Sequence, residues 1–253
     1  MIFYFSATGN SKYVALKIAA ETKEEPIAIA DCVKNQQFTF VEKDKEKIGF
    51  VTPTYFWGLP TIVGEFLEKL ELKIPDSHHS YIYHVATFGT TTGQAGRMVD
   101  EILKKRGLSL DGMFSVQMPD TWTPIFDLTD KEKIEKINHN AEMQIDEAIE
   151  KIKWEFFGDF SCRKIPMFAV KLFYPQYEKQ RKTKHFTVGD SCIGCGLCAR
   201  KCPVEAIEMQ GGKPVWVKEK CTLCLGCLHR CPKFAIQYGR KTKKHGQYVN
   251  PNV

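Results

Sequence analysis

Strand-length apolar runs and longer amphipathic stretches alternate along residues 1–157 of the chain. Several runs are continuously apolar, as strands buried on both faces of a parallel sheet are. We predict strands at Ile2–Phe5, Ile27–Ala30, Lys47–Val51, Tyr81–Thr87 and Leu110–Met118, with helices between them at Ser11–Thr22, Thr61–Leu70 and Gly93–Lys105. Because β and α elements alternate, the pattern predicts an α/β fold with a doubly wound five-stranded parallel sheet and helices on both faces.

A long, polar-rich helix follows these elements. We place it from Thr129 to about Trp154. Thr129 is its predicted N-cap, because Glu132 lies three residues later in the spacing of a capping box.

Residues 158–185 join the first part to the rest of the chain. Gly158, Pro166 and Pro175 interrupt any long helix there. The second part of this join is basic, with Lys179, Arg181, Lys182 and Lys184. The simplest interpretation is a solvated basic linker, and the alternative is a basic strip that docks one domain on the other.

Residues 186–238 contain an internal repeat. The run Cys192-Ile-Gly-Cys195-Gly-Leu-Cys198-Ala-Arg-Lys-Cys202-Pro203 recurs as Cys221-Thr-Leu-Cys224-Leu-Gly-Cys227-Leu-His-Arg-Cys231-Pro232, an offset of 29 residues. Ala206-Ile207 matches Ala235-Ile236 at the same offset. The repeat predicts a small α+β domain of two similar halves related by an approximate twofold axis.

The spacing of these cysteines is typical of two [4Fe–4S] clusters. Three thiolates spaced by two residues wrap one corner of a cubane, and in two-cluster ferredoxins the fourth cysteine, before proline, binds the other cluster. We therefore assign Cys192, Cys195, Cys198 and Cys231 to one cluster, and Cys221, Cys224, Cys227 and Cys202 to the second. Zinc is the alternative, but its Cys₄ sites usually use two separated pairs.

The placement of the cysteines and the composition of the chain narrow the class of protein further. Of 10 cysteines, only Cys32 and Cys162 lie outside the repeat, and we expect both to be unliganded and Cys32 to be buried. No apolar run reaches the roughly 20 residues of a membrane span, and the N-terminus lacks a basic signal-peptide region, so we expect a cytoplasmic protein with no membrane partner. A dense cysteine cluster in an unexported chain indicates metal rather than disulfides.

Charge is divided unevenly along the chain. Residues 1–160 sum to −7 and residues 161–253 to +13, which gives the net +6. We expect opposite charges to hold the two parts together, so that electron transfer between them slows at high salt.

A phosphate-binding loop is predicted directly after the first strand. Ser6-Ala7-Thr8-Gly9-Asn10-Ser11 brings hydroxyl groups, an amide and a glycine to the N-terminus of a helix, which favours an anion. The loop matches neither the nucleoside triphosphate motif nor the NAD motif. Simple capping of the helix is the alternative interpretation.

Two more loops emerge at the carboxyl ends of the third and fourth strands, where open α/β sheets bind ligands. The first loop offers aromatic faces to a flat ring, and the second offers glycine-rich backbone to its polar edge. The candidate residues are Pro53, Thr54, Tyr55, Phe56, Trp57 and Gly58 in the first, and Thr87, Phe88, Gly89, Thr90 and Thr91 in the second.

With these motifs in view, residues 1–155 resemble the flavodoxins and residues 186–238 resemble the bacterial-type 2[4Fe–4S] ferredoxins. The whole chain is similar to the flavodoxin–ferredoxin fusion family of anaerobes. The resemblance implies FMN, with Ser6, Thr8, Gly9, Asn10 and Ser11 around its phosphate, one of Tyr55, Phe56 and Trp57 stacked on its ring, and Phe88–Thr91 along the other side. Trp122 is also within reach, but we expect it to pack on the long helix. The basic tail, residues 239–253, is either disordered or folded back near a cofactor.

These features predict an electron-transfer flavoprotein that passes electrons between the clusters and FMN and serves redox partner proteins as donor and acceptor. One alternative is an FMN-dependent reductase of a small organic substrate. His78, His79 and His84 offer it no acid–base pair, since we expect each to be structural. A second alternative is a redox-sensing interaction protein. No nucleic-acid-binding module is recognisable, so we expect no nucleic-acid partner.

Overall fold

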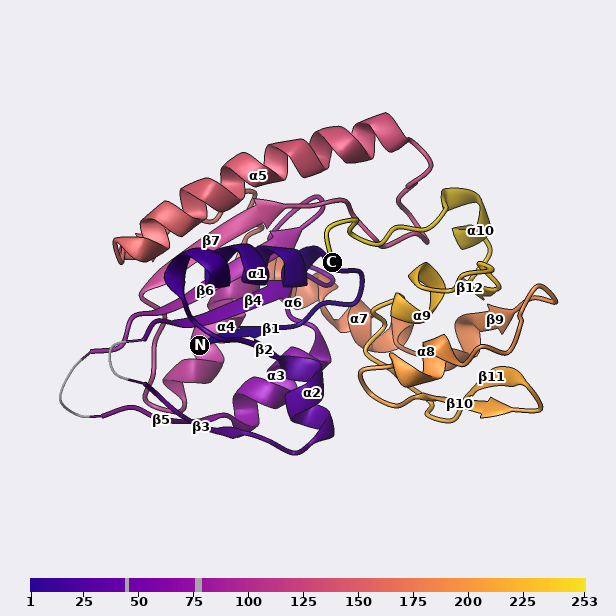
Figure 1. Cartoon of the computed structure of the whole chain (residues 1–253), viewed down its shortest axis with the longest axis horizontal. Coiled ribbons are helices and arrows are strands. Elements are labelled where there is room, and N and C mark those ends of the chain that lie inside the picture. Colours follow the sequence, from indigo (N-terminus) through magenta and orange to yellow (C-terminus); the bar gives the residue numbers. More distant parts are fainter. Residues whose placement is uncertain (44–45, 76–78) are drawn as a thin grey trace.

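The computed structural model describes residues 1–43, 46–75 and 79–253, and its largest element is a parallel sheet (Figure 1). The strand order is β2 (Pro26–Ala28), β1 (Ile2–Tyr4), β4 (Ile48–Pro53), β6 (Ile82–Phe88), β7 (Gly112–Gln117) and β8 (Gly158–Asp159). The first five are the predicted strands, and their order is that of a doubly wound sheet. The sixth, β8, was not predicted, because two residues that include a glycine carry no strand pattern.

Helices cover both faces of the sheet, as predicted. On one face lie α1 (Asn10–Thr22) and α5 (Lys131–Lys153), whose Ile18 and Ile145 belong to one buried cluster. On the other lie α2 (Ile29–Lys34), α3 (Thr61–Lys69) and α4 (Ala95–Lys104), packed on Phe3 and Phe50. Each large apolar side chain buried in these layers stabilises the fold by about 2 kcal/mol.

Some local predictions were wrong or incomplete. The N-cap of α5 is Asp130, whose Oδ1 accepts a hydrogen bond from Lys133 N at 3.0 Å, and not Thr129. Thr129 instead donates its backbone N–H to Asp127 Oδ1 at 2.8 Å. The short helix α2 and the parallel pair β3 (Thr39–Val41) and β5 (Glu71–Lys73) were not predicted either.

The join is folded against the rest of the molecule. It forms α6 (Met167–Phe173), α7 (Pro175–Gln180) and the short 3₁₀ helix η1 (Thr183–His185). Tyr177 of α7 is fully buried, and its hydroxyl donates a hydrogen bond to Thr222 O at 2.6 Å. The expectation of a solvated linker is therefore wrong at α7, because this tyrosine belongs to the core of the C-terminal part.

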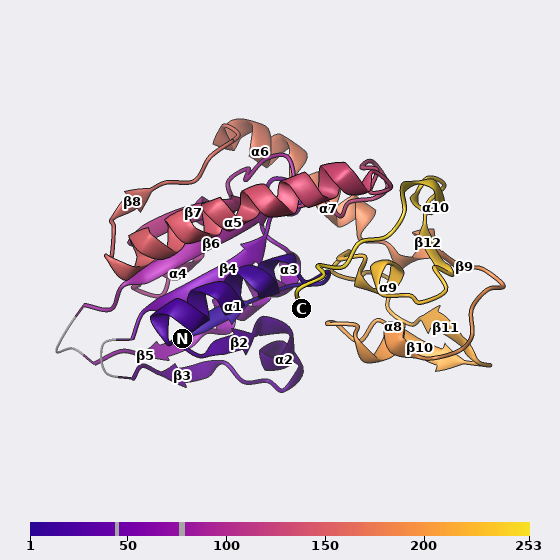
Figure 2. The same cartoon turned by 45° about the horizontal axis from the view of Figure 1, so that its top comes forward.

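The C-terminal part is a small region of short helices and strands beside the sheet (Figure 2). It contains two antiparallel pairs, β9 (Phe186–Val188) with β12 (Ile236–Tyr238) and β10 (Ile207–Gln210) with β11 (Lys213–Trp216). The two cysteine runs carry the one-turn helices α8 (Leu197–Arg200) and α9 (Gly226–His229). After α10 (Thr242–His245) the tail folds back, and the C-terminus lies near the start of α1 (Figure 1). Of the two alternatives for the tail, the structure shows the folded one.

Candidate functional site

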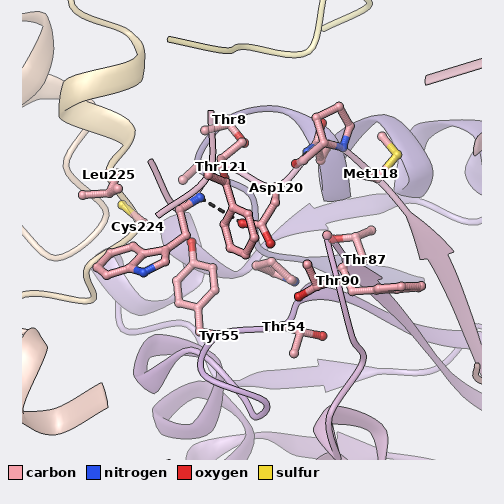
Figure 3. A pocket seen from close by; sticks show the side chains of 18 of the residues that line it. Thr8, Thr54, Tyr55, Thr87, Thr90, Met118, Asp120, Thr121, Cys224 and Leu225 are labelled. Atoms are coloured by element: carbon pink, nitrogen blue, oxygen red, sulfur yellow. Dashed lines mark hydrogen bonds between the residues drawn. The ribbon is translucent and has the colours of Figure 1, made fainter. Parts of the chain in front are cut away.

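A cavity of about 240 Å³ lies at the carboxyl edge of the sheet, facing the C-terminal part (Figure 3). The three predicted loops meet there. Every predicted flavin-site residue lines the cavity except Gly9 and Gly58: Ser6, Thr8, Asn10, Ser11, Pro53, Thr54, Tyr55, Phe56, Trp57, Thr87, Phe88, Gly89, Thr90 and Thr91. Gly9 and Gly58 pack on other parts of the chain, Gly9 against the tail and Gly58 against Tyr174.

The loop between β1 and α1 has the geometry of an anion site. Gly9 is in the left-handed region, with φ +100°, and donates its N–H to Ser6 Oγ at 3.1 Å. Ser11 Oγ is hydrogen-bonded to Thr87 Oγ1 at 2.8 Å, which ties the first loop to the loop after β6. Among the described residues no side chain caps the N-terminus of α1. The helix-capping interpretation of this loop is therefore wrong, because no side chain of the loop caps the first N–H groups of α1.

The aromatic loop is a tight and strained turn. Tyr55 and Gly58 exchange backbone hydrogen bonds of 2.9 and 2.8 Å, and the two residues between them, Phe56 and Trp57, have φ of 49° and 67°. Left-handed conformations at both central positions normally select Asn-Gly, so two aromatic residues there are costly. The turn holds both rings at the cavity, where Trp57 stacks on Phe173 with centroids 4.1 Å apart.

One polar group in the cavity lacks a partner. Thr54 Oγ1, at the end of β4, is buried and forms no hydrogen bond with any described residue. A buried hydroxyl without a partner costs about 1–3 kcal/mol, so this atom indicates a polar ligand. Aromatic faces, an anion site and an orphaned hydroxyl in one cavity fit FMN, whose ring is flat and whose phosphate is anionic.

The loop after β7 contributes cavity residues of which the sequence analysis had named Trp122 alone. Met118, Pro119, Asp120, Thr121 and Trp122 all line the cavity. Burial raises the pKa of Asp120 from 3.8 to about 6, although its carboxylate accepts a hydrogen bond from Trp122 N at 3.0 Å. A Cβ at Gly89 would lie 2.2 Å from Asp120 Oδ2, so this loop and the loop after β6 are in direct contact.

Trp122 is placed differently from the prediction. Its ring lies edge-on to Phe56 at 5.4 Å and tilted against Tyr238 at 5.6 Å, rather than on α5. It therefore joins the cavity to the C-terminal part. Its Pro-bounded loop was the only sequence signal for this position.

The far wall of the cavity comes from the C-terminal part. Leu223, Cys224 and Leu225 line it, and Cys224 is a predicted cluster ligand. Figure 3 shows Cys224 and Leu225 facing Tyr55 and Thr121 across the cavity. No sequence pattern identifies these residues as cavity-lining, because their position depends on how the two parts dock.

The cysteines form two sets. One small cavity of about 20 Å³ is lined by Cys192, Cys195 and Cys198 of the first run and by Cys231 of the second. This agrees with the assignment in which the fourth cysteine of each run belongs to the other set. In the other set, burial raises the pKa of the Cys224 thiol to about 12, and the neighbouring Cys221 and Cys202 thiols add to the shift. No described group of three or more His, Cys, Asp and Glu side chains converges closely enough to hold a single metal ion.

Backbone N–H groups point at the cysteine sulfurs. Ala206 N donates to Cys202 Sγ at 3.2 Å and Ala235 N to Cys231 Sγ at 3.3 Å, which are equivalent bonds in the two repeats. Such donors stabilise thiolates that bind a cluster. The equivalent donors in the two repeats fit cysteines that bind iron–sulfur clusters, and the ligand assignment stays a prediction.

The two repeats share unusual backbone angles. Gly194 and Gly196 have φ of 67° and 71°, and the residues 29 positions later, Leu223 and Leu225, both have φ of 53°. Leucine is disfavoured in this conformation, whereas glycine adopts it freely. The second repeat therefore keeps the cluster-loop geometry of the first while replacing two glycines by the leucines that line the flavin cavity.

No described histidine lines the cavity. His78 lies outside the described residues. His84 is fully buried on β6, its Nε2 lies 2.9 Å from Thr52 Oγ1, and burial lowers its pKa to about 3. His79 is exposed and bonded to Asp111 Oδ2 at 3.0 Å.

Opposite net charges do not hold the two parts together. Among the described residues, the ion pair between residues 1–157 and 186–238 is Lys34–Glu205, at 3.4 Å, and both side chains are more than half exposed. The contact is instead apolar, with Tyr55, Phe56 and Trp122 packed on the core of the C-terminal part. The contacts of the described residues do not bear out the predicted docking by opposite charges, since this ion pair joins a lysine of the acidic part to a glutamate of the basic part. The salt dependence of electron transfer stays a prediction.

Comparison with known proteins agrees with this architecture. A family model described as "Flavodoxin domain" matches residues 1–147, and one described as "4Fe-4S dicluster domain" matches residues 185–232. The first match covers more than half of the chain, which therefore belongs to the flavodoxin-domain family. The two matches together confirm the flavodoxin–ferredoxin fusion.

Individual relatives match only parts of the chain. A ferredoxin of Methanothermococcus thermolithotrophicus is 46% identical over 50 residues, 19% of this chain and 83% of that protein. A component of an ion-translocating oxidoreductase complex of Methanosarcina acetivorans is 41% identical over 46 residues, 18% of this chain and 17% of that protein. The solved structure of rubredoxin oxygen:oxidoreductase from Desulfovibrio gigas is 14% identical with a TM-score of 0.31, over 58% of this chain and 35% of that one.

The class of protein follows from these matches. It is an iron–sulfur flavoprotein of the electron-transfer type, because the flavodoxin domain implies FMN and the dicluster domain implies iron–sulfur clusters. No helix within the described residues has the length and apolar content to cross a membrane.

Proposed function

We propose that the protein transfers electrons between an external redox protein and FMN through two [4Fe–4S] clusters. In this proposal Cys192, Cys195, Cys198 and Cys231 hold an outer cluster, and Cys221, Cys224, Cys227 and Cys202 hold an inner one. FMN, when bound, supplies one-electron and two-electron chemistry, whereas each cluster exchanges single electrons.

The observation that carries this proposal is the position of Cys224. It is a predicted ligand of the inner cluster, and it lines the cavity that fits the flavin. The two redox sites thus share one wall, and no diffusion step is needed between them. Fusing them in one chain gives a high effective concentration of one for the other.

The surrounding residues suit this role. Leu223 and Leu225 are 3% and 2% exposed and keep water from the wall between the two sites. The outer set is closer to solvent, since Cys195 is exposed and Ile193 beside it is 59% exposed. A partner protein would therefore contact the molecule at the outer set, whereas the inner set serves the flavin.

Two measurements test the proposal. The protein purified without oxygen should contain one FMN and about eight irons per chain. Cys195→Ala should lower the iron content and slow reduction of the flavin by a reduced ferredoxin at least tenfold, measured with saturating FMN. Cys162→Ala, a cysteine outside both sets, is the matched control. A full complement of iron in Cys195→Ala, or unchanged flavin reduction by ferredoxin, would contradict the proposed route.

A second function, FMN-dependent reduction of a small substrate, is favoured by one observation. Asp120 places a carboxyl group in the flavin cavity, and simple electron transfer does not require a proton donor there. We infer that a reductase would use Asp120 to protonate its substrate. Turnover of a quinone that falls at least tenfold in Asp120→Asn, while reduction of the flavin by ferredoxin is unchanged, would support this function.

A further inference from the structure

The last seven residues, 247–253, form a strap over the phosphate-binding loop. Asn250 N donates to Thr8 O at 2.7 Å, and Asn250 Nδ2 donates to Asn10 Oδ1 at 3.3 Å. Asn250 is 3% exposed, so a polar side chain near the end of the chain is buried on the flavin domain. A Cβ at Gly9 would lie 2.7 Å from Val253 Cγ2 and 2.8 Å from Asn250 Cβ. The strap therefore packs on Gly9, which does not line the cavity, and is hydrogen-bonded to Thr8 and Asn10, which do.

The same strap is anchored on the cluster-binding segment. Gln247 Nε2 donates to Leu228 O at 2.6 Å and to Cys231 O at 2.9 Å. Tyr248 N donates to His229 Nδ1 at 3.3 Å, and the Tyr248 hydroxyl donates to Asn138 Oδ1 of α5 at 3.1 Å. The strap thus joins the end of α9 to the start of α1.

His229, the last residue of α9, and Arg230, which follows it, are hydrogen-bonded directly to the flavin loops. Arg230 Nε donates to Ala7 O at 2.7 Å, which is the carbonyl next to the one bound by Asn250. His229 Nε2 donates to Thr121 O at 2.9 Å in the loop after β7. Binding two successive carbonyls from outside the cavity fixes the peptide planes of the loop, and hence the direction of its N–H groups.

We propose that Asn250 and Arg230 are positioning residues for the flavin phosphate, so that tight FMN binding requires a folded cluster domain and an attached strap. The proposal rests on the proposed function, since it concerns FMN at this loop. Neither side chain lines the cavity. The Arg230 side chain holds the Ala7 carbonyl, and Asn250 holds the Thr8 carbonyl through its backbone N–H and Asn10 through its side chain. Cluster occupancy and FMN affinity are consequently linked through Gln247, Arg230 and Cys231.

The test is FMN affinity, measured anaerobically by quenching of flavin fluorescence on the flavin-free protein with clusters intact. Asn250→Ala keeps the backbone bond and should raise the dissociation constant about fivefold. Deletion of residues 247–253 removes the whole strap and should raise it about thirtyfold or more. Asn252→Ala is the control for the first, because its side chain makes no hydrogen bond among the described residues and it should leave affinity unchanged.

Arg230→Met should weaken FMN binding about tenfold, with Arg240→Met, an exposed arginine outside these contacts, as its control. Iron content and thermal unfolding of each variant show whether the cluster domain is still folded. Removing the clusters should weaken FMN binding in the full-length chain and have a smaller effect in the strap deletion, as coupled sites require.

The outcomes separate the two proposals. Wild-type protein that binds no FMN overturns the proposed function and this inference with it. Wild-type protein that binds FMN while the strap deletion and Arg230→Met bind it equally well overturns the inference alone. If the strap strengthens FMN binding, FMN binding must also stabilise the strap, so amide exchange of residues 247–253 should slow when FMN is added.

Discussion

Leu223 and Leu225 occupy positions at which the first repeat uses glycine. Each leucine in the left-handed region costs about 1 kcal/mol or more relative to glycine. Burying each side chain stabilises the fold by about 2 kcal/mol, and it also places methyl groups on either side of Cys224 in the wall of the flavin cavity. The cluster loop does not require leucine at these positions, because glycine adopts the same backbone conformation. The strained leucines are instead explained by their position in the cavity wall.

Leu225→Ala should separate these effects. It keeps a residue with a Cβ in the left-handed conformation and removes the buried side chain, so the cavity wall opens to water. We expect FMN affinity to fall about threefold to tenfold and the protein to lose about 2–3 kcal/mol of stability. Ile193→Ala in the exposed loop of the first repeat is the control and should change neither quantity appreciably. Equal FMN affinity in both variants would show that the wall has no part in flavin binding.

Asp120 gives the stability of the protein a defined pH dependence. Its pKa is raised by burial from 3.8 to about 6, so the folded state binds this proton more tightly than the unfolded state. Stability from this group is present at low pH and is lost as pH rises through about 6. Between pH 5 and pH 8 the free energy of unfolding of the wild type should therefore fall by about 1.4 kcal/mol relative to that of Asp120→Asn, because the Asn amide does not titrate.

The measurement is thermal unfolding of the flavin-free protein with clusters intact, at both pH values. The advantage of Asp120→Asn in Tm should grow by about 3–6 °C between pH 5 and pH 8. A Tm difference that is the same at both pH values would mean that Asp120 is not perturbed.

The start of α5 gives a prediction at the scale of a single element. Asp130 caps the helix through Lys133 N, and its negative charge also suits the positive end of the helix dipole. Asp130→Ala should lower stability by about 1 kcal/mol, seen as a Tm lower by about 2–4 °C. Thr129→Ala should have less than half this effect, because Thr129 lies outside the cap. A larger loss of stability in Thr129→Ala than in Asp130→Ala would show that Thr129 is the N-cap, as the sequence predicted.

Most elements followed from local patterns, because the physics that selects them is local. The five strands, the long helices, the three loops and the repeat all depend on periodicity or on motif spacing. The N-cap shifted by one residue because Asp130 and Thr129 are both good caps and only packing decides between them. Trp122, Asp120 and the leucine wall were missed or misplaced because their environment is made by docking, which leaves no periodic signal in one sequence.

At the scale of the whole molecule, three chain segments hold the two cofactor domains together. They are α7 with buried Tyr177, the end of α9 with His229 and Arg230, and the strap with Asn250. All three contact flavin loops directly, since Tyr177 stacks on Phe56 of the aromatic loop. The domains therefore form one unit whose geometry is fixed by apolar packing and by hydrogen bonds to backbone carbonyls, rather than by ion pairs between the domains.

This arrangement predicts how electron transfer responds to salt. The Debye length falls from about 10 Å at 0.1 M salt to about 3 Å at 1 M, so contacts between exposed opposite charges would weaken strongly over this range. Here the described ion pair between the domains is the exposed Lys34–Glu205 pair, which contributes well under about 1 kcal/mol. After a fast one-electron reduction of the clusters, the first-order reduction of the flavin should change less than about twofold from 0.1 M to 1 M NaCl.

Reduction by a separate protein donor provides the contrast in the same experiment. The second-order step between two proteins is steered by net charge. The +13 carried by residues 161–253 should therefore raise the rate at which an acidic ferredoxin associates with this protein and reduces it. That rate should fall at least tenfold over the same salt range, while the first-order rate within the chain stays constant. If the internal rate falls in parallel with the external one, the domains must separate and re-dock during each transfer, and the apolar contact seen at Tyr55, Phe56 and Trp122 would describe only one of two states.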